Sequence, residues 1–111
     1  MAIETFEKTS PLDGSLNDFL ITRIEFNKKT KEILSFCVLQ MHYSGEKTHE
    51  IIRFDTSHGF CHVHRFFEAL NSKGIKLAGI ACDQVGFNYC KNDVKSNWRN
   101  YKRRYIEKWI D

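Results

Sequence analysis

The fold is decided by the stretch Arg53-Phe54-Asp55-Thr56-Ser57-His58-Gly59-Phe60-Cys61-His62-Val63-His64. Aromatic and β-branched side chains, which favour strands, lie on both sides of its polar centre. At that centre, Gly59 suits the positive φ that a two-residue type I′ turn at His58-Gly59 requires. The stretch therefore predicts a β-hairpin.

The same turn fixes the residues that lie opposite each other. With His58-Gly59 as the turn, Ser57 lies opposite Phe60, and further out two pairs form: Asp55 with His62 and Arg53 with His64. Because side chains alternate along a strand, the four outer residues share one face of the hairpin. The other face carries a set suited to a core: Ile52, Phe54, Thr56, Cys61 and Val63.

Segments with strand composition also precede and follow the hairpin. We expect strands at residues 19–26, 33–43, 48–56 and 61–67, separated by short polar turns, and a short fifth strand at 75–80. Consecutive strands joined in this way form an antiparallel meander, here within residues 18–80. Residues 1–17 contain Pro11 and Gly14 and show no clear period, so we expect an irregular arm there.

The C-terminal part has the spacing of a helix. Its apolar residues are three or four positions apart: Phe87, Cys90, Val94, Trp98, Tyr101, Tyr105 and Trp109. This stripe predicts a helix over residues 84–110, with Asp83 as its N-cap. The helix is long enough to cross the sheet, with its aromatic residues in the core. The chain of 111 residues is thus expected to be one α+β domain, an antiparallel meander of four to five strands packed against a long C-terminal helix.

The composition is that of a globular protein, with 41% hydrophobic and 14% aromatic residues. There is no apolar run of about 18 residues and no apolar signal core at the N-terminus, so we expect a cytoplasmic protein that does not enter a membrane. The cysteines form no C-x-x-C pair, which disfavours a zinc knuckle. We interpret Cys37 and Cys90 as small core residues, and His42 and His49, beside a turn, as surface residues.

Positive charge is concentrated in the C-terminal segment. Residues 91–111 hold seven basic and three acidic groups, whereas the first 90 residues hold ten basic and eleven acidic groups. A basic helix attracts phosphates without regard to base sequence. The residues expected to bind an RNA substrate are His58, Arg99, Lys102 and Arg103. The alternative interpretation of the run at 102–104 is a solvated helix face.

The polar hairpin face has the groups that RNA cleavage needs. Asp55 would orient His62 and favour its protonated form, whereas the positive charge of Arg53 would disfavour the protonated form of His64. Two imidazoles biased toward different protonation states would suit an acid–base pair. Arg53 could also hold a phosphate through two hydrogen bonds. An RNA 2′-hydroxyl nucleophile requires no metal or cofactor. We therefore hypothesise an RNA-directed protein, a metal-independent endoribonuclease with Arg53, Asp55, His62 and His64 as catalytic residues.

Other interpretations of this face remain open. His62 and His64 could bind one metal ion, with Asp55 or His58 as a further ligand. The face could instead be a solvated ladder of ion pairs, on a non-enzymatic module that binds another protein through its sheet or helix. An unpaired strand edge would also allow a second copy of the chain to bind. A Cys61–His62 nucleophile pair is disfavoured, because adjacent strand residues point to opposite faces.

The hairpin motif resembles that of a family of small uncharacterised prokaryotic proteins. Their pattern reads R-[FY]-D-T-x-H-G-x-x-H-x-H and is followed by an aromatic, basic helix; the resemblance covers roughly residues 48–110. More remotely, the motif is similar to that of TumE-type toxins from toxin–antitoxin modules, in which R-[WY]-D-N precedes a His-rich stretch. Thr56 stands here where those toxins have Asn. The remote resemblance implies a toxin-like activity and a cognate antitoxin as partner.

Overall fold

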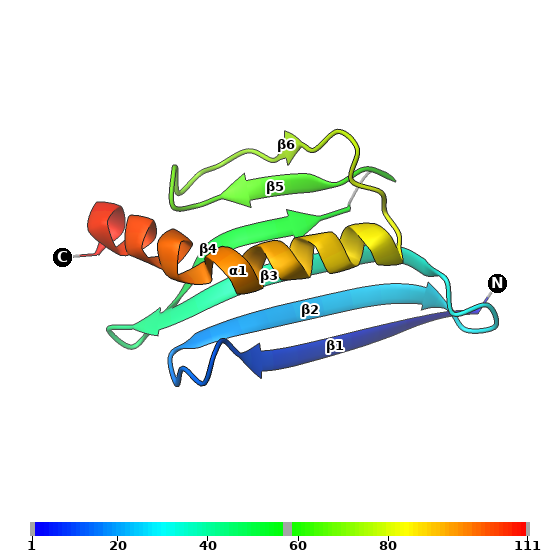
Figure 1. Cartoon of the computed structure of the whole chain (residues 1–111), viewed down its shortest axis with the longest axis horizontal. Coiled ribbons are helices and arrows are strands. Elements are labelled where there is room, and N and C mark those ends of the chain that lie inside the picture. The colour runs from blue at the N-terminus through cyan, green and yellow to red at the C-terminus, as the bar shows by residue number, and fades with distance from the viewer. Residues whose placement is uncertain (1, 57–58, 111) are drawn as a thin grey trace.

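The computed structural model describes residues 2–56 and 59–110, which form one antiparallel sheet with a helix across one face (Figure 1). The strands pair in chain order: β1 (Ile3–Pro11), β2 (Asp18–Asn27), β3 (Ile33–Ser44), β4 (Lys47–Asp55), β5 (His62–Arg65) and β6 (Ile75–Lys76). Helix α1 (Gln84–Trp109) follows. The predicted α+β meander with a C-terminal helix is confirmed. In this part of the chain the sheet has six strands instead of four to five.

The additional strand is β1, so the prediction of an irregular arm is wrong for residues 3–11. β1 pairs with β2 along its whole length, from Ile3 opposite Asn27 to Pro11 opposite Phe19. Its residues from Ile3 to Thr9 are all exposed. Burial therefore imposes no apolar alternation on this strand, and backbone pairing to β2 holds it in place. The sequence offered no period by which to detect it.

The last strands are shorter than expected. β5 covers His62–Arg65 within the predicted 61–67, and β6 covers only Ile75–Lys76 within the predicted 75–80. α1 ends one residue before the predicted end, a difference within the usual uncertainty of helix ends. No helix in the described ranges is long and apolar enough to cross a membrane.

The core lies between α1 and the sheet face that the helix covers. The predicted core face of the hairpin is confirmed, because all five of its residues are buried: Ile52, Phe54, Thr56, Cys61 and Val63. On α1, Val94, Trp98 and Tyr105 are buried as well, whereas Tyr101 is half-buried and Trp109 is exposed at the end of the helix. Within residues 2–56 and 59–110, no helix lies over the other face of the sheet (Figure 1).

Asp83 caps the start of α1, as its position predicted. Its carboxylate accepts a hydrogen bond from the Gly86 backbone N–H at 3.1 Å, one of the amides that a helix start leaves without a partner. Gly86 is required for close packing at this point. A Cβ added to it would lie 1.7 Å from the backbone oxygen of Ala81.

The predictions for Cys37 and His42 are wrong. β3 alternates between its two faces, and Cys37 lies on the face away from α1, half-buried and paired with Asp55 of β4. His42, predicted to be a surface residue, falls in phase with buried Val38 and is itself buried. Its imidazole lies 2.8 Å from the carboxylate of Asp18, which is only 1% exposed. Cys90 is buried in the core, as expected.

Candidate functional site

The predicted register of the hairpin is confirmed. β4 and β5 pair with Asp55 opposite His62 and Arg53 opposite His64, on the face away from α1. Gly59 has a φ of 83°. Ser57 and His58 lie outside the described residues, and with them the predicted turn and the substrate contact assigned to His58.

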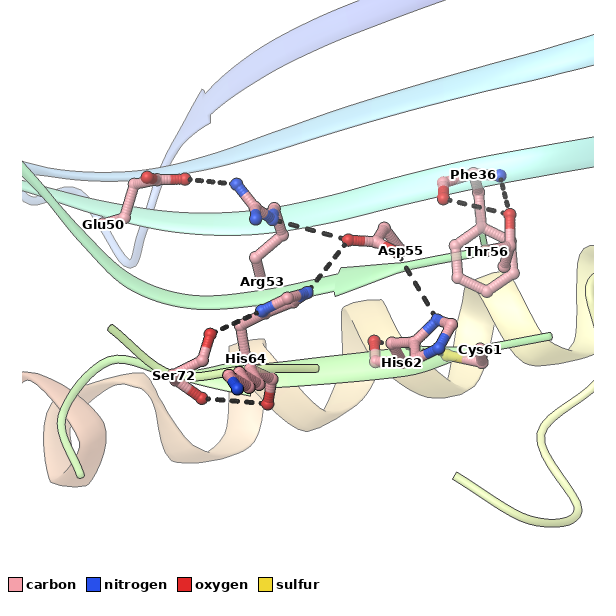
Figure 2. Close-up of polar contacts among 10 residues, drawn as sticks. Phe36, Glu50, Arg53, Asp55, Thr56, Cys61, His62, His64 and Ser72 are labelled. Atoms are coloured by element: carbon pink, nitrogen blue, oxygen red, sulfur yellow. Dashed lines mark hydrogen bonds and ion pairs between the residues drawn. The ribbon is translucent and has the colours of Figure 1, made fainter. Parts of the chain in front are cut away.

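Asp55 is the centre of the cluster that Figure 2 shows. Its Oδ2 lies 3.4 Å from His64 Nε2 and 3.5 Å from Arg53 Nε, and its Oδ1 lies 3.8 Å from His62 Nδ1. The side chains of all four residues are half-buried, between 16% and 34% exposed. The Asp55 carboxylate thus lies close to three basic side chains, at a surface that is still accessible to solvent. We call these four residues the hairpin cluster.

His64 is held from two sides. Its Nδ1 lies 3.0 Å from the backbone oxygen of Ser72, and its Nε2 faces Asp55. A carbonyl oxygen only accepts hydrogen bonds, so Nδ1 carries a proton. The contact of Nε2 with Asp55 is a hydrogen bond at the same time only when Nε2 also carries a proton. Gly74 makes room for this ring, because a Cβ on Gly74 would lie 2.9 Å from His64 Nε2.

These contacts correct part of the expected electrostatics. We expected His64 to experience mainly the positive charge of Arg53, opposite to the environment of His62. The ion pair that His64 makes is instead with Asp55, diagonally across the strands, and Asp55 also adjoins His62. Both imidazoles therefore lie beside the same carboxylate. His64 has a further partner in the Ser72 carbonyl.

Arg53 is shared between two carboxylates. A register shift between Gln40 and Met41 leaves Ile51 as an extra residue in β4 and brings Glu50 to the same face as Arg53. Arg53 Nη1 then lies 3.2 Å from Glu50, while its Nε faces Asp55 (Figure 2). The sequence pattern did not reveal Glu50, because a bulge breaks the alternation.

Aromatic rings adjoin both imidazoles. The ring of Phe60 lies 4.4 Å from that of His62, centroid to centroid. Phe66 stacks on His64 at 5.9 Å and 15°, and the guanidinium of Arg53 lies 5.6 Å from the Phe66 ring. Sequence reasoning did not select either phenylalanine. The i, i+2 spacing from His64 to Phe66 was the available signal.

A shallow cavity of about 200 Å³ borders the cluster beside Asp55. Arg23, Cys37 and Thr56 are among its lining residues. Burial, together with the negative charge of Asp55, raises the pKa of the Cys37 thiol to about 11. Cys37 therefore stays protonated near neutral pH and does not provide a thiolate nucleophile. The cavity offers space for a ligand next to the carboxylate.

The helix residues predicted to bind substrate do not join this cluster. Arg99, Lys102 and Arg103 belong to α1, which covers the opposite face of the sheet. Lys102 donates to Asp18 at 2.9 Å, Arg99 forms an ion pair with Asp13, and Arg103 donates to Asn100. The structure therefore separates the predicted catalytic set from the predicted phosphate-binding set by the thickness of the sheet.

Two alternatives can be compared with the geometry. Cys61 points into the core, with its sulfur 4.0 Å from that of Cys90, so it lies on the opposite face from His62 as expected. Over residues 2–56 and 59–110, no group of three or more His, Cys, Asp and Glu side chains is arranged to hold a metal ion. His58, named as a further ligand, is outside those ranges.

Fold and site define a small α+β domain in which an antiparallel meander carries a polar His–Asp–Arg cluster on one face and a long helix on the other. Residues 6–110 match the sequence model of a family described as a domain of unknown function (DUF7718). The match covers nearly the whole chain, so the chain belongs to this family. No curated protein and no solved structure matches it.

Proposed function

We propose that the hairpin cluster is an RNA-directed site that cleaves a phosphodiester without a metal ion. The supporting observation is the convergence of two imidazoles and a guanidinium on the Asp55 carboxylate, on the sheet face that α1 leaves uncovered. Acid, base and phosphate-binding groups within one hairpin are what transfer of a phosphoryl group to an adjacent hydroxyl requires. We also propose that the protein acts in the cytoplasm.

The two histidines take different roles in this proposal. His62 removes the proton from the RNA 2′-hydroxyl, whose oxygen attacks the adjacent phosphorus. His64, whose nitrogens both face acceptor atoms, gives its Nε2 proton to the departing 5′-oxygen. The products are a 2′,3′-cyclic phosphate and a 5′-hydroxyl. Arg53 neutralises the charge that develops on the phosphoryl oxygens, and Asp55 orients both rings.

The test is incubation of the purified full chain with total RNA, with and without a chelator. We expect cleavage that the chelator leaves unchanged, with cyclic phosphate ends. His62→Ala and His64→Ala should each abolish it. His49→Ala removes one imidazole from the opposite face, where His49 adjoins Tyr105, and should retain activity. Intact RNA at micromolar protein would contradict the proposal, and cleavage lost with chelator would favour the metal-binding alternative.

A toxin-like role adds a partner to this picture. An antitoxin would inhibit the protein by covering the hairpin cluster, since Asp55, His62 and His64 are only half-buried by the chain itself. Co-expression with the neighbouring gene product tests this. RNA cleavage should disappear when the two proteins copurify and should return when they are separated.

A second candidate function is a non-enzymatic module that binds another protein, and the exposed edge of β1 favours it. Among the described strands β1 pairs only with β2, which leaves its other edge open over nine residues. The partner that suits this edge best is a second copy of β1. If two copies pair antiparallel about Phe6, each Glu4 lies opposite the Lys8 of the other copy.

A further inference from the structure

A second cavity is separate from the hairpin cluster. It has a volume of about 530 Å³ and lies between β1 and β2 on one side and the first half of α1 on the other. Lys8 and Leu20 line its strand wall, and Lys91, Lys95 and Arg99 line its helix wall. Its volume falls in the range of roughly 300–1,000 Å³ typical of small-molecule sites. We call this cavity the basic groove.

Four cations line the basic groove, and within the described residues one of them, Arg99, is in an ion pair. Arg99 forms an ion pair with Asp13 at the rim. Over the residues that the structure describes, Lys8, Lys91 and Lys95 form no salt bridge. Like charges around a concave surface repel one another and attract anions. The groove therefore carries a local positive field that the salt bridges of residues 2–56 and 59–110 leave uncompensated at these three lysines.

Lys91 shows that these charges act on one another. Burial lowers the pKa of Lys91, and the positive charges of Lys95 and Lys8 lower it further. Its ammonium also lies 4.5 Å from the centre of the Phe87 ring, against which the side chain rests. Lys8 belongs to β1, whereas Lys91 and Lys95 belong to α1. The fold therefore brings these lysines together, since they do not form one run of charge in the sequence.

The spacing of the cations selects the shape of the anion. Lys91, Lys95 and Arg99 are four residues apart on α1, which gives a row of about 12 Å at 1.5 Å per residue. A row of this length exceeds the reach of a single phosphate. Beneath it, buried Leu20 and Trp98 give the groove an apolar base. The facing wall adds Lys8, so a bound chain of anions would meet cations from both sides.

We propose that the basic groove binds a chain of linked phosphate groups, either a free polyphosphate such as a nucleoside triphosphate or the backbone of a single nucleic-acid strand. This site goes beyond the proposed function. It lies on the helix side of the sheet, whereas the hairpin cluster lies on the other side, and it needs no reaction at the cluster.

The experiment measures affinity for two probes, inorganic tripolyphosphate and a short single-stranded oligodeoxyribonucleotide, which lacks the 2′-hydroxyl and is not cleaved. Trp98 lines the groove, so its fluorescence reports binding in the intact chain. The variant Lys8→Gln/Lys95→Gln should weaken binding by about tenfold or more, because it removes two phosphate-facing charges. The control Lys29→Gln/Lys47→Gln loses the same charge at exposed positions in and beside turns, and its affinity should stay within about twofold of the parent.

The pattern of results identifies the source of the phosphates. Groove-dependent binding of tripolyphosphate alone indicates a free polyphosphate, and groove-dependent binding of the oligonucleotide indicates a strand. The proposal is overturned if neither probe binds, or if the control weakens binding as much as the groove variant. His62→Ala should leave the affinity for tripolyphosphate unchanged, and the groove variant should still cleave a dinucleotide. Failure of the groove is thereby distinguished from failure of the hairpin cluster.

Discussion

At the scale of single residues, the hairpin cluster depends on a position that has no side chain. Gly74 faces His64, and a Cβ there would also approach His62 Cβ at 3.1 Å. An imidazole at the end of its side chain can rotate away from such a contact, but it then leaves Asp55 and the Ser72 carbonyl. The placement of His64 is therefore determined as much by Gly74 as by its charged neighbours.

We predict that Gly74→Ala displaces the His64 ring and reduces RNA cleavage by about tenfold or more, while the protein stays folded. The ring signals of His64 in NMR spectra, together with the cleavage rate, provide the measurement. Ser72→Ala is the matched control. It changes a side chain in the same loop but keeps the backbone carbonyl that His64 contacts, so its spectrum and rate should resemble the parent. Unchanged His64 signals in Gly74→Ala would contradict this role.

The two faces of the hairpin should also differ in their stability effects. Phe54 is 3% exposed, so Phe54→Ala should reduce the free energy of unfolding by about 3–5 kcal/mol. His62→Ala should cost less than about 1 kcal/mol, since His62 lies on the open face. Urea unfolding of both variants gives the comparison. Equal losses of stability in the two variants would mean that the assignment of the core face and the open face of the hairpin is wrong.

The sequence predicted the strand pairing of these residues, but it did not predict all of their side-chain contacts. The pairings of Asp55 with His62 and of Arg53 with His64 followed from a two-residue turn, because register depends only on local chain length. The contact of His64 with the Ser72 carbonyl did not follow. It depends on where the chain goes after β5, and residues 66–74 have no periodic pattern from which that path could be read.

At the scale of elements, a buried network of hydrogen bonds joins α1 to the sheet. Asp18, at the start of β2, accepts hydrogen bonds from Lys102 of α1 at 2.9 Å and from Ser15 at 2.8 Å. His42 of β3 lies 2.8 Å from its other oxygen. Three segments of the chain thus meet at one carboxylate. The sequence did not reveal this network, because Lys102 and Asp18 are 84 residues apart in the chain.

This network should make stability depend on pH at the acid end. Burial raises the pKa of Asp18, but the hydrogen bonds from Lys102, Ser15 and His42 outweigh burial, and the pKa falls below its ordinary value of 3.8. A carboxyl with a lowered folded-state pKa contributes stability above its unfolded value, and this is lost as pH falls through the folded value. The contribution should therefore be complete above about pH 4 and decline below it.

Asp18→Asn tests this linkage. The variant should be less stable than the parent at pH 7, and the difference should narrow as the pH falls below 3.8. Urea unfolding across that range measures it. Asp13→Asn is the control, because Asp13 is exposed and its ion pair with Arg99 contributes little. A constant difference between parent and Asp18→Asn at all pH values would contradict the linkage.

At the scale of the whole molecule, the two edge strands of the sheet differ in length. β6 is only two residues long, whereas β1 offers nine residues, and Ile3 and Phe6 on it are more than half exposed. Long open edges recruit other strands unless charge or proline blocks them. In β1 the charges of Glu4 and Lys8 become complementary when two copies pair antiparallel about Phe6. This complementarity is the reason that the second candidate function proposes a second copy as the partner of this edge.

A charge swap tests this pairing, with sedimentation over a wide concentration range as the measurement. The parent should dimerise. Glu4→Lys should weaken the dimer, because two positive charges would then face each other at both cross-strand pairs, and Glu4→Lys/Lys8→Glu should restore it by exchanging the signs. Glu7→Lys, which faces Thr5 in this register, should have little effect. A monomeric parent would exclude the dimer. Equal weakening in Glu4→Lys and the swapped variant would exclude the register about Phe6, because only that register places residue 4 opposite residue 8.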